Sequence, residues 1–152
     1  MDKKLVAILV IFLFVLWYAL RTAQIPPANI QASAEVFYIN NETVTIVEKD
    51  GWGLFTLEVK PRISGFTFEI DFPQGTEYLI KVNGKEYKGT TTFKVTIDRD
   101  SEIIVNFKLP QEETINLYRG ESEYYLTIKA TKFPIWRVEY KIKLVPRKEG
   151  KY

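Results

Sequence analysis

Alternating apolar and polar residues dominate the chain after residue 34. Successive side chains of a β-strand point to opposite faces, so this pattern predicts strands with one buried face. The clearest example is GFTFEIDFP, residues 65–73, where four apolar side chains alternate with polar ones. The side chains expected to point inward are Phe55, Leu57, Val59, Phe66, Phe68, Ile70, Phe72, Tyr78, Ile80, Val82, Phe93, Val95, Ile97, Ile103, Val105, Phe107, Leu109, Tyr124, Leu126, Ile128, Trp136, Val138, Tyr140, Ile142 and Leu144.

Turn signals separate these segments at intervals of eight to fifteen residues, among them Asp50-Gly51 and Asn83-Gly84. We therefore expect about eight short strands and no helix after Gln24. This arrangement is typical of an all-β, immunoglobulin-like two-sheet β-sandwich, and a closed barrel is the alternative that the pattern leaves open. The chain has no cysteine, which excludes the disulfide of antibody domains.

A different pattern opens the chain: LVAILVIFLFVLWYAL, residues 5–20, holds sixteen apolar or aromatic residues in a row. A helix of that length rises about 24 Å, which is short of the roughly 30 Å of bilayer hydrocarbon. Extension through Ala23, with snorkelling of the flanking lysines and Arg21, closes the gap. The segment predicts a transmembrane signal-anchor helix over residues 1–23. Its expected membrane contacts are Leu5, Leu9, Phe12, Leu16, Trp17 and Tyr18.

Lys3 and Lys4 place the N-terminus in the cytoplasm and the rest of the chain outside the plasma membrane. A cleaved signal peptide is one alternative, although Arg21-Thr22-Ala23 has arginine where a small residue belongs. A pilin-like helix is another, although Lys4 precedes the apolar run and Pro26-Pro27 interrupts any continuation. The sequence leaves cleavage of this segment open.

The remaining chain divides by composition. Residues 24–34 are polar and contain prolines, which predicts a stalk. Residues 35–147 form the predicted extracytoplasmic sandwich, and residues 148–152 form a basic tail. The abundance of Lys, Glu, Ile, Val and Tyr, with one Met, resembles the usage of hyperthermophile proteins, so we expect an archaeal source.

One stretch resembles a known class of modules. In INLYRGESEYYLTIKATKFPIWRVEYKIKLV, from Ile115 to Val145, a Gly-Glu-Ser turn leads into LTIKA, and a Tyr-x-Ile-x-Leu strand follows. This is similar to the last two strands of immunoglobulin-like modules in archaeal and bacterial surface proteins. The resemblance implies a non-enzymatic role in adhesion, spacing or assembly. One N-terminal anchor before one outward sandwich is also similar to the plan of archaellum stator subunits.

The net charge of +2 is unevenly spread, since seven basic and two acidic residues follow position 131. The candidate basic surface consists of Lys141, Lys143, Arg147 and Lys148. Such a cluster attracts anionic lipid headgroups or acidic glycans, whereas an extracytoplasmic location argues against nucleic acid. The interpretation that we favour is that Arg137, Glu139, Lys141 and Lys143 form the solvent face of an edge strand, where charge prevents edge-to-edge pairing.

Two polar motifs are candidates for modification or metal binding. Asn41-Glu42-Thr43 is an N-glycosylation sequon between two short predicted strands. Asp98, Asp100 and Glu102 are acids at alternate positions, a spacing from which Ca²⁺ can take oxygen ligands. Because the glycine of a calcium loop is missing, a polar turn is the simpler interpretation.

Two further patterns bear on carbohydrate chemistry. Trp52, Tyr118 and Tyr125 are aromatic residues outside the expected core and could form a sugar-stacking platform. Glu69 and Asp71 lie on one strand face, about 7 Å apart by strand rise. A glycosidase also needs a cleft and a raised carboxyl pKa, which spacing does not provide.

The chain contains no histidine and no cysteine, and no Ser-Lys constellation stands out. We therefore expect no catalytic residue, no cofactor and no metal. The function predicted is a structural or interaction subunit of a cell-surface or membrane assembly. Its expected partners are membrane lipids and other protein subunits, with a homo-oligomer as a further option. The alternatives are a self-assembling filament, pilus or coat subunit, and a surface carbohydrate-binding or hydrolytic module.

Overall fold

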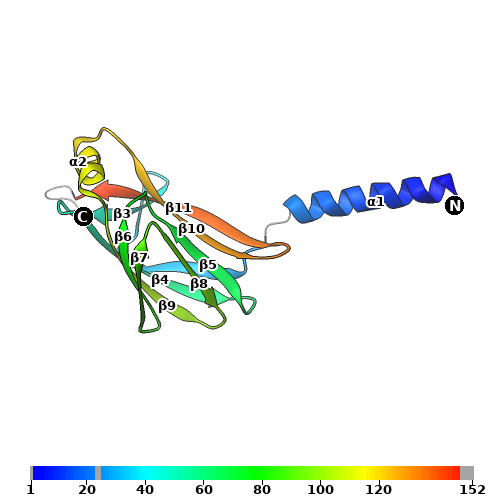
Figure 1. The fold of residues 1–152 in the computed structure, drawn as a ribbon, viewed down its shortest axis with the longest axis horizontal. Coiled ribbons are helices and arrows are strands. Elements are labelled where there is room, and N and C mark those ends of the chain that lie inside the picture. The colour runs from blue at the N-terminus through cyan, green and yellow to red at the C-terminus, as the bar shows by residue number, and fades with distance from the viewer. Residues whose placement is uncertain (1, 23–24, 148–152) are drawn as a thin grey trace.

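The protein consists of an N-terminal helix and a β-rich domain that lie end to end (Figure 1). The computed structural model describes residues 2–22 and 25–147, and of residues 20–22 only the backbone. Helix α1 spans Lys3–Thr22. Within the described part of the chain, no helix combines the length and the hydropathy that crossing a membrane requires. The structure thus confirms a helix at the N-terminus but not the transmembrane span predicted for it.

The domain is mostly β, as the alternation predicts, and its described residues contain eleven strands. The strands are β1 (Ala28–Ala34), β2 (Phe37–Ile39), β3 (Glu42–Val47), β4 (Trp52–Pro61), β5 (Phe66–Asp71), β6 (Glu77–Val82), β7 (Lys85–Thr90), β8 (Thr92–Ile97), β9 (Ser101–Lys108), β10 (Tyr124–Lys132) and β11 (Trp136–Pro146). Nine of them follow each other in the order β7-β6-β9-β4-β3-β11-β10-β5-β8, while β1 pairs with β4 and β2 with β3. All pairs in the sheet are antiparallel except the parallel pair of β3 with β11.

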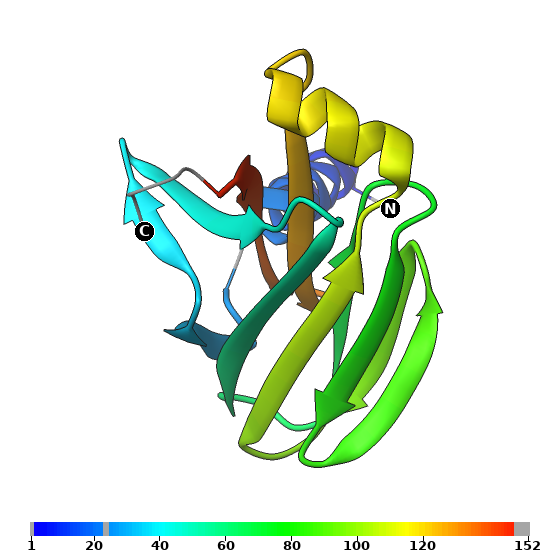
Figure 2. The same ribbon diagram turned by 90° about the vertical axis from the view of Figure 1, so that its left-hand side faces the viewer.

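The strands form two layers that belong to one continuous sheet (Figure 2). The first layer holds β7, β6, β9, β4 and β1, and the second holds β2, β3, β11, β10, β5 and β8. Between β3 and β4 the ladder is the single pair Val47–Gly53 among the described residues. At the other end β7 contacts β8, so the sheet is nearly barrel-shaped. The expected pair of separate sheets is therefore wrong, because a tight hairpin carries the ladder from one layer to the other.

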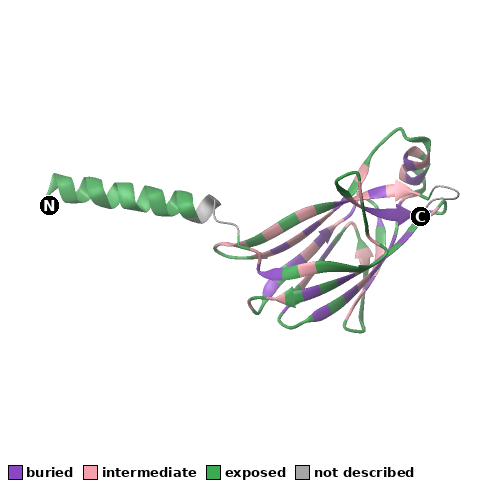
Figure 3. Ribbon diagram, turned by 180° about the vertical axis from the view of Figure 1, so that it is seen from behind, coloured by how far each residue is buried: buried purple, intermediate pink, exposed green. Residues whose placement is uncertain are grey.

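The predicted inward faces form one hydrophobic core between the layers. Phe55, Phe66, Phe68 and Phe107 are fully buried. Buried and exposed positions alternate along the strands, as the colours of Figure 3 show. Aromatic rings close the side where β7 meets β8, because Tyr78 and Tyr87 both pack against Phe93. Six of the expected inward residues pack against this core while only partly buried: Tyr78, Val82, Val95, Tyr124, Val138 and Tyr140. The expectation for Trp136 is wrong, because this residue is partly buried and lies outside the core cluster.

Helix α2 (Gln111–Arg119) overturns the expectation that no helix follows Gln24. Glu112 and Glu113 lie in the first turn and Arg119 lies in the last turn, where their charges stabilise the helix by opposing its dipole. Gly120 ends it in the left-handed conformation, with φ of 72°. The helix covers the far end of the two layers, above the core (Figure 2).

The predicted stalk is also partly wrong. Strand β1 pairs with β4 from Ala28 opposite Pro61 to Ala34 opposite Thr56, so these residues belong to the sheet. This segment is polar because it is an edge strand: among the described residues it pairs only with β4. Most of its side chains face solvent, so the strand needs no alternation of apolar residues. Residue 24 of the expected stalk, residue 23 of the expected anchor helix and the basic tail 148–152 lie outside the described residues.

The register defines two ends of the domain. The turns after β4, β6, β8 and β10 lie at the end near α1, which we call the proximal end (Figure 1). The β3–β4 turn and helix α2 lie at the opposite, distal end (Figure 1). β11 runs from the proximal to the distal end and connects them directly.

Candidate docking site between strands β3 and β4

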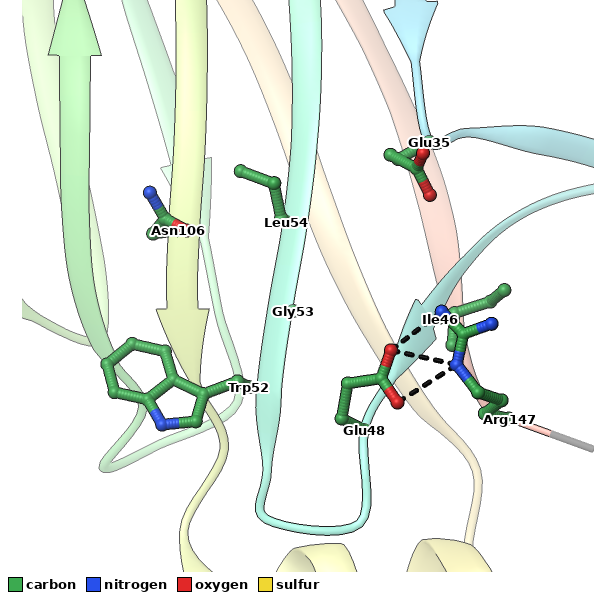
Figure 4. Close-up of a pocket in the computed structure, with 8 residues that line it drawn as sticks. All are labelled: Glu35, Ile46, Glu48, Trp52, Gly53, Leu54, Asn106 and Arg147. Atoms are coloured by element: carbon green, nitrogen blue, oxygen red, sulfur yellow. Dashed lines mark hydrogen bonds and ion pairs between the residues drawn. The ribbon is translucent and has the colours of Figure 1, made fainter.

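A cleft of about 340 Å³ opens where β3 and β4 diverge at the distal end. β3 joins β11 in the second layer and β4 joins β9 in the first, so the strands separate on the side of the Val47–Gly53 pair that faces away from the turn, between Ile46 and Leu54. The cleft is lined by Glu35, Ile46, Glu48, Trp52, Gly53, Leu54, Asn106 and Arg147 (Figure 4). The sheet itself therefore forms a hollow at this corner.

The local sequence explains the tight hairpin. Gly51 adopts a φ of 93°, and its N–H donates to the Glu48 carbonyl at 2.9 Å. The N–H of Glu48 donates to the carbonyl of Trp52 at 2.8 Å. A side chain on Gly53 would collide with the ring of Phe107, so glycine is required for the close approach of β4 to this ring.

One wall of the cleft carries an ion pair. The Arg147 Nε lies 2.8 and 2.9 Å from the two Glu48 carboxylate oxygens, and its Nη2 lies 2.6 Å from Oε1 (Figure 4). The two side chains are 44% and 45% exposed, so the pair contributes at most about 1 kcal/mol. An incoming group can therefore displace either partner at small cost.

The Tyr118 hydroxyl holds this wall in place through two hydrogen bonds. It donates to the Val47 carbonyl at 2.6 Å and accepts from the Arg147 N–H at 3.2 Å. Helix α2, β3 and the end of β11 are thereby joined at one atom. Tyr118 is used as a structural link here, and not as part of a sugar-stacking platform.

The opposite wall is apolar and aromatic. Trp52 and Leu54 are each 46% exposed, and Figure 4 shows both on the side away from the Glu48–Arg147 pair. Leu54 lies opposite Asn106 on β9, and the Lys108 ammonium sits 5.6 Å from the Trp52 ring centre. These groups suit binding of a mixed apolar and polar segment.

The outer edge of β1, which ends beside this cleft just before Glu35, carries no charged side chain. Its seven residues, ANIQASA, contain no acidic or basic side chain, and within the described chain β1 pairs with β4 only. Exposed edges usually carry charges that prevent pairing with other chains. The β1 edge lacks that protection, whereas the opposite edge strand, β7, contains Lys85, Glu86 and Lys88.

The candidate basic surface is largely neutralised by neighbouring groups. The Lys143 ammonium lies 3.6 Å from Glu42 and 3.5 Å from Glu123. Arg147 pairs with Glu48, and the Lys141 ammonium lies 5.9 Å from the Tyr125 ring centre. Lys148 lies outside the described residues. The structure thus distributes Lys141, Lys143 and Arg147 among separate partners. The expected edge strand is only partly right, because β11 pairs with β10 and, from Lys143 onward, also with β3.

The acidic pair Glu69 and Asp71 forms part of a charge ladder across the outer face of the second layer. Lys94 pairs with Glu69, and Lys129 contacts both Glu69 and Asp71. Burial favours a higher pKa for Asp71, but hydrogen bonds with Glu69 and Lys129 and the Lys129 charge outweigh it and lower the pKa. A lowered pKa is the opposite of what a glycosidase acid needs.

The other sequence candidates lie apart from the cleft. Asn41 is exposed in the two-residue turn between β2 and β3, with φ of 64°. The turn around Asp98 and Asp100 is at the proximal end, and among the described residues no three acidic side chains gather as a metal site would require. Tyr125, on β10, donates its hydroxyl hydrogen to the Glu123 carboxylate at 2.8 Å. The three aromatic candidates thus have separate local partners.

Sequence reasoning missed Leu54 and the Glu48–Arg147 pair. A signal for Leu54 was present, because it occupies the outward phase of a strand whose inward residues are Phe55 and Leu57. Glu48 and Arg147 are 99 residues apart, and only the pairing of β3 with β11 brings them together.

No family model and no curated protein matches this sequence. Among solved structures, AvmM, which catalyses macrocyclization in alchivemycin A biosynthesis, has 8% identity and a TM-score of 0.46, covering 85% of this chain and 94% of its own. The CooA pilin subunit of enterotoxigenic Escherichia coli has 12% identity and a TM-score of 0.35, with coverages of 80% and 97%. A CARDB domain from Pyrococcus furiosus, in complex with di-metal ions, has 10% identity and a TM-score of 0.32, with coverages of 83% and 96%. Similarity at this level assigns the chain to no family.

Proposed function

We propose that the protein is a non-enzymatic interaction subunit, anchored by α1 in the plasma membrane with its N-terminus inside and its β domain outside. The observation that carries this proposal is the contrast between the two parts. The β domain encloses its own core, whereas α1 exposes apolar side chains such as Leu5 (56%), Phe12 (61%) and Phe14 (67%). Apolar surface of this extent requires an apolar environment.

The flanking residues support a bilayer as that environment. Lys3 and Lys4 can extend to the inner headgroups, while Trp17 and Tyr18 suit the outer interface. The sequence continues the apolar run through Leu20. In this arrangement α1 holds the β domain at the outer surface.

The docking partner that the distal cleft fits is an extended segment of another protein subunit. Such a segment would pair its backbone with the uncharged β1 edge and place side chains against Trp52 and Leu54. The opening of the Glu48–Arg147 pair would admit a polar group beside them. This mode needs no catalytic residue.

Photocrosslinking from the protein in its native membranes tests the proposal. A benzophenone amino acid at Glu35, which is exposed, lines the cleft and directly follows β1, should crosslink to one partner subunit. We expect Leu54→Lys to abolish the product, because it places a charge on the apolar wall, whereas Lys88→Glu on β7 should preserve it. Carbonate extraction of the same membranes should leave the protein in the pellet.

The outcomes separate the alternatives. Release of the protein by carbonate would contradict the anchor. A product that survives Leu54→Lys would contradict docking at the cleft. A product with twice the mass of the chain would instead identify a second copy as the partner and support the filament or coat alternative.

A further inference from the structure

The tip of the β10–β11 hairpin, residues 132–136, presents an unusually exposed phenylalanine. The Phe133 side chain is 93% exposed, whereas Phe55, Phe66, Phe68, Phe72, Phe93 and Phe107 are at most 5% exposed. Exposing a complete aromatic ring to water is unfavourable, so this residue is suited to an apolar environment outside the domain.

The residues that flank the tip have defined contacts within the domain. Lys132 pairs with Trp136 as the last step of the hairpin ladder, and the Lys132 ammonium donates to the Ser64 carbonyl at 2.7 Å. Arg137 pairs with Glu139, with 2.9 Å between guanidinium nitrogen and carboxylate oxygen.

The chain fixes this tip close to the end of α1. The Ile25 N–H donates to the Ile135 carbonyl at 3.2 Å, and the Arg137 N–H donates to the Ile25 carbonyl at 2.8 Å. Helix α1 ends at Thr22, three residues before Ile25. Three residues span at most about 11 Å, so Ile25, to which the tip is hydrogen-bonded, lies within that distance of the helix end. Figure 1 shows the β10–β11 hairpin as the part of the domain that reaches toward α1.

We propose that the hairpin tip rests on the outer surface of the membrane, with the Phe133 ring at the boundary between headgroups and acyl chains. This inference depends on the proposed anchoring of α1 in the bilayer. Pro134 and Ile135 add apolar surface beside the ring, while Lys132 and Arg137 lie at the level of lipid phosphates. The tip and α1 together give the domain two attachments to the membrane, and therefore a fixed orientation.

A fluorophore at a single cysteine tests the contact, because the chain has no cysteine of its own. Full-length Phe133→Cys, labelled with an environment-sensitive dye, is reconstituted in vesicles of phosphatidylcholine and phosphatidylglycerol. We expect a blue shift, and loss of emission when the lipids carry a nitroxide quencher on their acyl chains. Ser122→Cys, exposed at the distal end, is the matched control and should show neither effect.

A second pair of variants changes Phe133 itself, while the dye stays at a neighbouring position. With the dye on Pro134→Cys, the lipid quenching should persist in Phe133→Leu and be lost in Phe133→Asp, because a carboxylate is expelled from the acyl boundary.

Vesicle flotation distinguishes failure of this inference from failure of the anchor. If the protein floats with the vesicles but the dye at position 133 behaves like that at position 122, the tip contact is overturned and the anchor stands. If the protein does not float, both proposals are overturned.

Discussion

At the scale of single residues, the cleft depends on a missing side chain. Gly53 lies between the outward Trp52 and Leu54, and the Phe107 ring fills the space that its side chain would take. That ring also contacts Phe55 at 6.1 Å and Phe72 at 5.7 Å between centres. One position therefore couples the cleft to the core.

Gly53→Ala should lower the free energy of unfolding by about 1–3 kcal/mol, because the added carbon overpacks the space taken by Phe107. Denaturant unfolding of the full-length protein in detergent measures this change. The neighbouring Leu54→Ala should change stability much less, because Leu54 is 46% exposed. Adding Phe107→Leu should recover part of the Gly53→Ala loss relative to the sum of the single changes. Strict additivity would argue against the packing explanation.

At the scale of elements, α2 shows what the pattern could not predict. Its start and stop signals, Pro110, Glu112 and Gly120, are all present in the sequence. Yet of its nine residues only Thr114 and Leu117 are buried, which is too few to display a helical period. β1 was missed for a similar reason, since an exposed edge strand has no apolar alternation to detect.

The Tyr118 hydroxyl should be the main polar link between α2 and β3. Tyr118→Phe removes a donor to Val47 and an acceptor for Arg147, so we expect a loss of about 1–2 kcal/mol in unfolding free energy. Hydrogen exchange should rise in α2 and at the end of β11. Tyr125→Phe is the control, because that hydroxyl contacts only an exposed glutamate among the described residues. Equal effects of the two substitutions would contradict the assigned link.

At the scale of the whole molecule, the helix and the β domain are separate in their packing. Every buried hydrophobic residue of the described chain lies at or beyond Ala28. The alternation of residues such as Phe66, Phe68 and Ile70 was enough to predict the core, because side-chain period determines which face is buried. The cleft could not be predicted, since it depends on which strands become neighbours. Contacts such as Lys143 with Glu42 arise from strand order, which local patterns do not determine.

A fragment of residues 24–152 should therefore fold in water without detergent. We expect its thermal unfolding to be cooperative, with a midpoint within a few degrees of that of the full-length protein in detergent. Circular dichroism measures the transition, and vesicle flotation should show that the fragment no longer floats. An unfolded or aggregated fragment would mean that α1 contributes to the stability of the domain.

The length of strand β11 determines how the domain would carry a mechanical load. Its eleven residues, from Trp136 beside α1 to Pro146 next to the cleft, extend about 35 Å. Nine register pairs join it to β10. A pull applied at the cleft against the anchor would run along this strand and load those rungs together in shear, instead of opening them one by one. If α1 anchors the chain and the cleft binds a partner, as proposed, β11 is the strand that carries tension between the two.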